Sequence, residues 1–444
     1  MAGPTLLGMA RGTHLREYTF AHYHLGARWF GALGYHDLYQ QTLAAGGPSA
    51  DGVRDLRTYA IGPSEPARSP SWSDADWAAF QADVAALTPR QSDGSWRSWY
   101  RDKGYNASPA WTATLGRLLG ARPASDGWFR LVAWMDVGLL GLGLLALAWG
   151  FGVAPAFAVG AAVVLWPGSR DDLLGGPLQT DWFAALCASA ACLRRDRPML
   201  GGALLGWSAA SRLFPALLLL GPLALAARGQ QDARRMLVGA AVVGLLALGL
   251  GSTTPRGPAA WGEFAGKMQT HTALHHLGDR RVGLKPLLAW APVQGTDAEA
   301  RADRAARWEG RAPVAWGLTA LLVLGFGAAF GRGLRDRSRP VDPLGALLLG
   351  LPLTFLLLTL SRYYVLAPAL LLLVRPRWLG ASFLLVAALG QAALVTDARD
   401  ANVWALVNLG LLALTVLGMG AWARRPDAFS ASAASPSSPS PPSP

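Results

Sequence analysis

From residue 128 onward, the chain alternates between long apolar stretches and short polar turns. The apolar stretches cover residues 128–151, 153–168, 181–193, 199–212, 213–227, 236–252, 313–331, 343–361, 363–374, 378–396 and 402–423. Some of them approach the roughly 20 residues that a helix needs to cross a hydrocarbon core, and the others are shorter. The shorter ones are expected to be half-helices whose irregular backbone is buried in protein or lines a cavity, because lipid offers no hydrogen-bond partners. The pattern predicts an all-α polytopic integral membrane protein with about 11 transmembrane or part-spanning helices.

Two long segments lack this pattern. Residues 1–127 are of mixed polarity, are rich in Trp, Tyr, Gly, Pro and Ser, and contain no spanning run, so they are predicted to fold outside the membrane. Residues 253–312 form a second polar loop between the membrane regions 128–252 and 313–423. The last residues, 424–444, are rich in Ser, Pro and Ala, which is typical of a disordered tail.

The composition agrees with a membrane protein, because 52% of the residues are hydrophobic and only 15% are charged. The net charge of +12 comes mainly from arginine, and no nucleic-acid-binding motif accompanies it. The expected partner is therefore the lipid bilayer and not a nucleic acid. Cys187 and Cys192 lie in one apolar stretch and are expected to be small core residues instead of a disulfide.

Basic residues are concentrated in short turns that fall on one side of the predicted bundle. These turns are RRDR at 194–197, RGQQDARR at 228–235, RGLRDRSR at 332–339, RPR at 375–377 and Arg424–Arg425. Because short cytoplasmic loops collect Lys and Arg, this side is predicted to be cytoplasmic, with the C-terminus, in a multi-pass protein of the inner (plasma) membrane. Residues 1–127 and 253–312 are then extracytoplasmic. The second of these loops is also basic, but long loops follow the rule weakly.

One arginine, Arg212, lies inside the apolar sequence GALLGWSAASRLFPALLLLGPL at 202–223. At the centre of a single span it would cost roughly 2.5–3.5 kcal/mol to insert, and Pro215 would remove a backbone hydrogen bond there as well. Residues 199–227 are therefore predicted to form two short helices that turn near Arg212, with the guanidinium at the outer water interface. There it would act either as a snorkelling anchor or as a cation that faces an anionic substrate.

Four further polar blocks fall on the same predicted side as Arg212. EYTFAHYHLGARWFGALGYHDLYQ at 17–40 and YRDKGYNASPAW at 100–111 lie in the N-terminal segment. DDLLGGPLQTDW at 171–182 and FLLLTLSRYYVLAP at 355–368 interrupt the apolar stretches. Polar and charged side chains gathered at one face of a membrane protein are typical of a functional site.

In their order, these blocks resemble glycosyltransferase family 87, the polyprenol-phosphate-mannose-dependent transferases of the GT-C superfamily. The resemblance rests on the aromatic block at 17–40, on GYNASPAW ahead of the first span, and on the GG…TDW loop. Its most specific part is RRDRPMLGGALLGWSAASRLFP at 194–215, a basic turn followed by a helix and a cation just before a proline. The resemblance covers roughly residues 15 to 375 and implies a GT-C-like helical bundle with an extracytoplasmic N-terminal segment.

The chain departs from the family pattern near its start. The family begins with a transmembrane helix that is followed directly by a presumed catalytic aspartate. Here Thr19 stands at the aspartate position, Glu17 lies two residues earlier, and no span precedes them. Either the chain starts further upstream, or this protein lacks the first helix, or the base has moved to another position. Of these we expect the first, with a helix encoded upstream of Met1.

The resemblance implies transfer of a mannose-like hexose from a polyprenyl-phosphate donor to a lipid or glycan acceptor, with inversion and on the extracytoplasmic side. A carboxylate would deprotonate the acceptor hydroxyl, and cations would meet the charge that grows on the leaving phosphate. Glu17 and Asp102 are the candidate bases, and Arg212, Lys285 and Arg362 are the candidate phosphate-binding cations. The other candidate substrate-binding residues are His22, Tyr23, His24, Asn106, Asp171, Asp172, Asp181 and Tyr363. No cofactor is expected.

Several of the carboxylates also have simpler interpretations. Glu17 fits a solvated residue at a helix start, and Asp102 fits a turn residue in RDKGYN. Asp171 and Asp172 fit helix-capping or solvated residues as well as a pair that holds a divalent ion. Asp136, within the first span, is interpreted as an intramembrane polar contact that could pair with an arginine of a neighbouring helix.

The sequence HTALHH contains His271, His275 and His276 at spacings that could place two imidazoles on one helical face. No carboxylate motif accompanies them, so the segment is interpreted as an interfacial loop and no metal site is predicted.

Two other functions fit part of the pattern. A lipid or glycan transporter would place Asp136 and Arg212 along a translocation path, but the paired half-sequences common in transporters are not seen here. A catalytically inactive relative would account for Thr19 at the aspartate position. The two long outer segments favour an enzyme.

Overall fold

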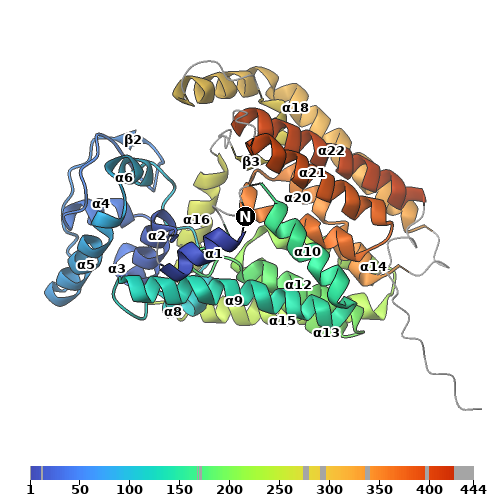
Figure 1. The fold of residues 1–444 in the computed structure, drawn as a ribbon, viewed down its shortest axis with the longest axis horizontal. Helices are drawn as coiled ribbons and strands as arrows, with labels where there is room; N and C mark the ends of the chain where they lie inside the picture. The colour runs from blue at the N-terminus through green and yellow to red at the C-terminus, as the bar shows by residue number, and fades with distance from the viewer. Residues whose placement is uncertain are drawn as a thin grey trace, which may run out of the picture.

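The structure is a computed structural model that describes residues 2–11, 14–167, 169, 173–273, 280–290, 297–335, 341–395 and 400–424. Within these residues the chain is mostly helical, and its strands are two antiparallel pairs with two residues in each strand. Figure 1 shows the short helices of the N-terminal segment on one side of a bundle of longer helices. The predicted all-α class is confirmed at this level.

The N-terminal segment is built from short elements around a core of aromatic side chains. Its first elements are α1 (Ala2–Arg11), α2 (Glu17–Arg28), α3 (Phe30–Leu33), α4 (Leu38–Ala44), β1 (Val53–Arg54), β2 (Ile61–Gly62), α5 (Asp74–Leu87), η1 (Thr88–Arg90) and α6 (Asp93–Tyr100). A last helix runs through α7 (Pro109–Trp111), the π-helical turn η2 (Thr112–Gly116) and α8 (Arg117–Leu119). Buried side chains such as Trp96, Trp99 and Tyr105 give the segment a hydrophobic core of its own.

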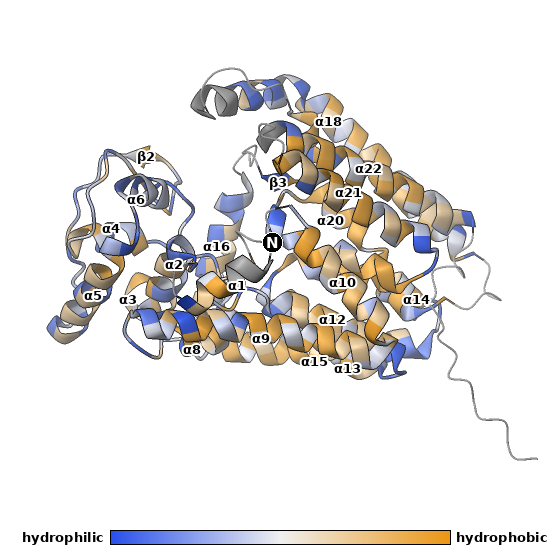
Figure 2. Ribbon diagram, viewed as in Figure 1, coloured by the Kyte–Doolittle hydropathy of each residue, from blue (hydrophilic) through white to orange (hydrophobic). Residues whose placement is uncertain are grey.

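The remaining helices are more apolar, as Figure 2 shows. They are α9 (Asp126–Phe151), α10 (Val153–Leu165), α12 (Asp181–Arg194), α13 (Pro198–Ser211), η3 (Phe214–Leu219), α14 (Leu220–Ala227), α15 (Gln231–Gly251), α18 (Asp297–Gly333), α19 (Pro343–Leu348), α20 (Leu351–Leu357), η5 (Ala367–Leu373), α21 (Arg377–Val395) and α22 (Asp400–Arg424). Between them lie α16 (Ala259–Ala273), β3 (Arg281–Val282), α17 (Leu284–Leu288), β4 (Leu360–Ser361) and η4 (Arg362–Tyr364). Cys187 and Cys192 of α12 are buried free thiols, as predicted.

Each of the eleven predicted apolar stretches contains at least one helix, but eleven crossings are not confirmed. Among the described residues, five helices are long and apolar enough to cross a membrane: Asp126–Phe151, Gln231–Gly251, Asp303–Gly333, Arg377–Val395 and Asn402–Arg424. α12 and α13 have 14 residues each, which gives about 21 Å against a hydrocarbon core of roughly 30 Å. α10 is separated from α9 by Gly152, whose φ of +92° ends the helix.

Small residues let two of these helices approach closely. A Cβ added at Gly202 of α13 would clash with the carbonyl oxygen of Met236 in α15, and one at Gly239 of α15 would clash with that of Met199 in α13. Backbone contact of this kind is how helices gain packing energy in lipid, where hydrophobic burial gives no driving force. The glycines of the 194–215 block therefore have a structural role.

The antiparallel pair α12 and α13 separates two groups of polar residues. At one end, the Ser211 hydroxyl donates a 2.6 Å hydrogen bond to the Asp181 carboxylate. At the other end, a polar pocket is lined by Arg194, Asp232 and Asp342. The basic turns at 194–197 and 228–235 thus lie together, at the opposite end of the helix pair from Arg212.

Candidate substrate and catalytic site

The helix break predicted at Arg212 is present. α13 ends at Ser211, Arg212 has an extended backbone with φ −137° and ψ 113°, and η3 begins at Phe214 with Pro215 in its first turn. Proline suits this position because the first residues of a helix have no acceptor for their N–H groups. The prediction of two short helices around Arg212 is confirmed.

The prediction that the guanidinium lies at a water interface is wrong, because Arg212 is enclosed in protein and is only 7% exposed. Its Cζ atom lies 5.9 Å from the ring centroid of Tyr23 and 5.8 Å from that of Trp111, both in the N-terminal segment. Within the described residues, the guanidinium makes one long hydrogen bond, 3.4 Å from Nη1 to the carbonyl of Ser211, and Nε has no partner. A guanidinium has five donors, so most of its capacity to bind a phosphate or a carboxylate is unused.

Asp181 and two tyrosines complete the surroundings of Arg212. Oδ2 of Asp181 accepts the bond from Ser211, and among the described residues Oδ1 has no hydrogen-bond partner. Tyr363 and Tyr364 of η4 interact electrostatically with the guanidinium, as does Asp181. Segments far apart in the sequence therefore meet at Arg212: α2, α7, the start of α12, the α13–η3 junction and η4.

Tyr364 lines an apolar cavity that is partly open, so that its roughly 790 Å³ of empty space includes the space at its mouth. Its walls come from η3, α20, η5 and α22 and include Phe214, Leu351, Phe355, Leu371, Leu411 and Leu414. The ring of Tyr364 lies 5.3 Å from that of Phe214, so the cavity adjoins the residues around Arg212. A ligand with an anionic head and a long apolar tail would match these two neighbouring environments.

The polar block at 17–40 holds the block at 100–111 in place through three tyrosines. Gly104 N–H donates to the Tyr39 hydroxyl at 2.8 Å, the Tyr23 hydroxyl donates to Asn106 Oδ1 at 3.0 Å, and the Tyr35 hydroxyl donates to the Ala107 carbonyl at 2.8 Å. Gly104 has a φ of +67°, which a residue with a side chain rarely adopts. These bonds fix the loop that carries Asp102.

Asp102 is the candidate base that lies in this group of residues. Its side chain is 41% exposed, and Oδ2 lies 4.0 Å from Nε2 of His22. Burial alone would raise the pKa of Asp102, but His22, Lys103 and Arg281 together hold the pKa below its usual value. Asp102 is therefore an anion at neutral pH, and water can reach it.

His22 supports this loop as a neutral ring. Its Nδ1–H donates to the Tyr18 carbonyl at 3.0 Å, and its Nε2 accepts from the Tyr39 hydroxyl at 2.9 Å. This assignment of the tautomer follows from the carbonyl, which can only accept. Burial lowers the pKa of His22 to about 4, so the ring is uncharged at physiological pH.

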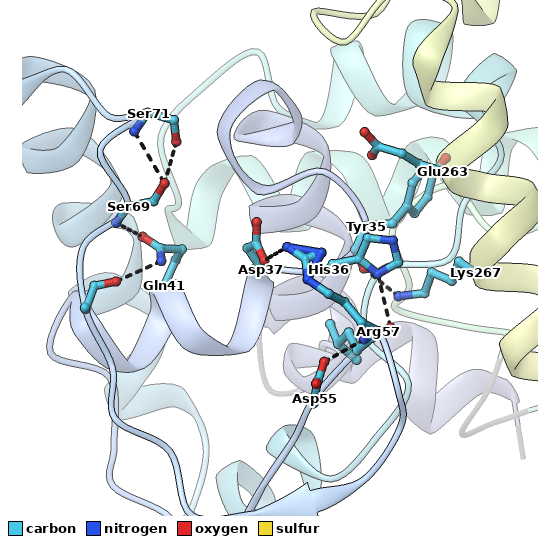
Figure 3. Close-up of polar contacts among 12 residues, drawn as sticks. Tyr35, His36, Asp37, Gln41, Asp55, Arg57, Ser69, Ser71, Glu263 and Lys267 are labelled. Atoms are coloured by element: carbon cyan, nitrogen blue, oxygen red, sulfur yellow. Dashed lines mark hydrogen bonds and ion pairs between the residues drawn. The ribbon is translucent and has the colours of Figure 1, made fainter.

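Three cations lie near the carboxylate of Asp102. The β3–β4 pairing places Arg281 opposite Ser361, and Nη1 of Arg281 donates to the Ser361 hydroxyl. Burial, with a further contribution from Arg281, lowers the pKa of Lys103 to about 7. Lys267 of α16 is fully buried and donates to the Tyr35 carbonyl at 2.8 Å, as Figure 3 shows. Burial also lowers the pKa of Lys267 to about 7.

Glu17, the other candidate base, has different neighbours. The charges that act on it most are Arg90 and Asp126, which form an ion pair with each other at 2.5 Å. Burial raises the pKa of Glu17. The described contacts do not bring Glu17 to Arg212 or to Asp102.

Three more predicted site residues also contact other partners. Nε2 of His24 lies 3.9 Å from Asp83, Nζ of Lys285 lies 4.7 Å from the Trp308 ring, and Cζ of Arg362 lies 5.9 Å from the Trp404 ring. Of the candidate residues, the structure thus gathers Tyr23, Asn106, Asp181, Arg212 and Tyr363 around one centre. His22 and Asp102 form a second group, and Arg281 acts electrostatically on both Asp102 and Tyr364.

Asp171, Asp172, His275 and His276 lie outside the described residues. His271 lies near the end of α16, with Nδ1 3.5 Å from the Tyr59 hydroxyl.

Asp136 makes the polar contact between segments that was expected of it, and it hydrogen-bonds to Thr180. One of its carboxylate oxygens accepts from the Thr180 N–H at 2.8 Å and from the Thr180 hydroxyl at 2.6 Å.

The sequence interpretation missed several members of this site. Arg16 donates to Gln179 at 2.7 Å, and both interact with Tyr23. Tyr364 and Arg281 were also not selected. Tyr364 could have been found, because it belongs to the SRYY interruption of an apolar stretch. Arg281 lies in a loop with many other arginines, and only its pairing with β4 distinguishes it.

Comparison with known proteins gives no further information on this site. No protein-family model, no curated protein and no solved structure matches the chain. The functional conclusion therefore depends on the geometry and chemistry of the residues themselves.

Proposed function

We propose that the protein is a membrane glycosyltransferase with a GT-C-like bundle. It would move a hexose from a polyprenyl-phosphate donor to a lipid or glycan acceptor on the extracytoplasmic side, with inversion of the anomeric carbon. The observation that supports this proposal most is the position of Arg212, a buried guanidinium with unused donors beside an apolar cavity. The resemblance of the polar blocks to family 87 supports it independently.

The donor would lie across the junction between Arg212 and the cavity. Its phosphate would accept hydrogen bonds from the guanidinium, which is enclosed by Tyr23, Trp111 and Tyr364. Its polyprenyl chain would occupy the cavity walled by residues such as Phe355 and Leu411. A buried cation is costly unless it is paired with an anion, and the lipid phosphate would supply that anion.

Asp102 would act as the base in the transfer step. Its carboxylate accepts the proton of the acceptor hydroxyl, and the acceptor oxygen attacks the anomeric carbon from the side opposite the leaving group. The bond from that carbon to the phosphate oxygen breaks, and its electron pair leaves with the polyprenyl phosphate. Arg212 stabilises the negative charge that this phosphate gains, which is where its effect on the rate would arise.

The test is sugar transfer by the purified protein in nanodiscs. Polyprenyl-phosphate mannose and polyprenyl-phosphate glucose, each labelled in the sugar, serve as donors, and a membrane-lipid extract of the producing cells supplies the acceptor. The expected result is a labelled glycolipid together with free polyprenyl phosphate. A protein that carries the intact labelled donor across vesicle membranes and never releases the sugar is a transporter, and that result would refute the proposal.

A further inference from the structure

A second group of cations lies close to the Arg212 site. Tyr364 interacts electrostatically with Arg212 and also with Arg281 of β3. Within the described residues, the charges that act on Asp102 and its neighbour Lys103 come from separate parts of the chain. Their cationic members are Arg54 of β1, Lys103 of the 100–111 block, Lys267 of α16 and Arg281 of β3.

Uncharged oxygens hold three of these cations, Arg54, Lys267 and Arg281, in position. Nε of Arg54 donates to the Arg101 carbonyl at 2.9 Å, Nζ of Lys267 donates to the Tyr35 carbonyl at 2.8 Å, and Nη1 of Arg281 donates to the Ser361 hydroxyl. Such bonds orient a side chain and satisfy some of its donors, but they do not neutralise its charge. The described part of this group contains four basic side chains, two arginines and two lysines, and one carboxylate, Asp102.

The titration of the two lysines reflects this arrangement. Burial lowers the pKa of Lys103 and of Lys267 to about 7, and Arg281 lowers that of Lys103 further. A bound anion would favour the protonated form of both lysines. It would also pair with Arg281, whose side chain is only part-buried and is within reach of a ligand beside Asp102.

We propose that Arg281, Lys103 and Arg54, with Lys267 behind them, form a second anion-binding subsite that is separate from Arg212. Its ligand is a phosphate or carboxylate group of the acceptor substrate, so the enzyme glycosylates an anionic lipid or an acidic glycan. The assignment to the acceptor rests on the proposed function, because the base Asp102 must lie beside the acceptor hydroxyl. The existence of the anion subsite does not depend on that function.

Binding measurements on the full-length protein in neutral nanodiscs test the subsite. Three probes are used: dioctanoyl phosphatidylglycerol as an anionic headgroup, dioctanoyl phosphatidylcholine as its zwitterionic counterpart, and inorganic phosphate as a free anion. The variants are Arg281→Gln, Lys103→Gln and Arg212→Ala. Arg280→Gln is the matched control, because it removes the same charge from an exposed neighbouring residue. Arg281→Lys, which keeps the charge, and the midpoint of thermal unfolding show whether the β3–β4 pairing survives.

We expect the wild type to bind anionic probes at two sites and to lose one site in Arg212→Ala. Arg281→Gln and Lys103→Gln should weaken the site that remains in Arg212→Ala about tenfold or more, the effect of one charged hydrogen bond. Arg281→Lys should restore part of the affinity, and Arg280→Gln should change little. If these variants bind only phosphatidylglycerol more weakly, the ligand is a lipid headgroup. If they bind inorganic phosphate more weakly to the same degree, the ligand is the phosphate group itself.

Two results would overturn the inference. One is complete loss of anion binding in Arg212→Ala, which would leave a single site. The other is an Arg281→Gln variant that is folded and binds like Arg280→Gln. Failure of the proposed function would look different, because sugar transfer would be absent while both anion sites still bound their probes.

Discussion

Substitution of Arg212 by alanine separates the function of this residue from its contribution to folding. Alanine accepts the extended backbone at this position, and Pro215 remains to define the start of η3. The variant loses two cation–π contacts, with Tyr23 and Trp111, each worth about 0.5–2 kcal/mol. It also loses the electrostatic attraction between the guanidinium and the buried Asp181 carboxylate. Against these losses, the variant no longer has to bury a charged guanidinium away from water, which is favourable. The two effects oppose each other, so we expect the free energy of unfolding to change by only about 1 kcal/mol.

The effect of Arg212→Ala on turnover should be larger than its effect on stability. If the guanidinium binds the leaving phosphate more strongly in the transition state than in the ground state, its loss lowers kcat by about 10²–10³, as for an oxyanion-hole donor, or about 2.7–4 kcal/mol. Arg212→Lys should recover only part of this loss, because lysine keeps the charge but cannot form two parallel bonds to one phosphate. The assay is release of labelled sugar from polyprenyl-phosphate mannose in nanodiscs, with thermal unfolding measured on the same samples.

Arg235→Ala is the matched control for this experiment. It removes an exposed arginine that pairs with Asp232 at 3.3 Å, near the start of α15 and at the other end of the α12–α13 pair. It should leave turnover unchanged. Wild-type turnover by a folded Arg212→Ala protein would refute the reasoning and would leave Arg212 as a structural residue. An unfolded variant would refute the expected balance of energies, and Arg212→Lys would then report on the function.

Four further predictions concern the base, the neutral His22 ring, the packing of α13 on α15, and the topology. Asp102→Asn should lower kcat by about 10²–10⁴, measured by sugar transfer, without weakening donor binding, measured at equilibrium. Unchanged turnover would show that another residue is the base. Because burial lowers the pKa of His22 to about 4, the unfolded state binds a proton between pH 6.5 and 4 that the folded state does not. The melting temperature should therefore fall as the pH drops through this range, and fall less in His22→Asn; parallel curves would contradict the assignment. Gly202→Leu should destabilise the protein by several kcal/mol, because its side chain would meet the backbone of α15, and an unchanged chemical-unfolding midpoint would exclude that packing. In intact cells, a cysteine at Ser92 should react with an impermeant thiol reagent and one at Ser338 should not, and the reverse result would invert the topology.

The apolar pattern predicts where the helices lie better than it predicts how many of them cross the membrane. Hydropathy gives each of the eleven stretches, and the proline after Arg212 gives the break between α13 and η3. It does not give helix length, because the single apolar stretch 343–361 is divided into the short helices α19 and α20 without a change in hydropathy. The membrane depth of α12 and α13, with 14 residues each, follows from their packing and not from composition.

Helical periodicity could have argued against Glu17 as the base, because it places Glu17 and Tyr23 on different faces of α2. On α2, Glu17 and His24 are seven residues apart and share a face, whereas Tyr23 points about 120° away from Glu17. The structure accordingly places His24 near Asp83 and Tyr23 near Arg212. The contact of Tyr23 with Arg212 itself could not be predicted, because it joins segments far apart in the chain and depends on how the N-terminal core packs against the membrane helices.

The location of the site between two hydrophobic cores bears directly on the proposed chemistry. Arg212 is 7% exposed, whereas the side chain of Asp102 is 41% exposed. Arg212 contacts Tyr23, and the Tyr23 hydroxyl bonds to Asn106, which lies four residues along the chain from Asp102. A cation that must bind a lipid phosphate gains strength in a region of low dielectric constant, where its field is poorly screened. A base that must accept a proton from an incoming hydroxyl needs access from water and a stable anionic form, and Asp102 has both. Neither core alone offers both environments, and in the proposed reaction the junction between the N-terminal segment and the membrane helices supplies them within one site.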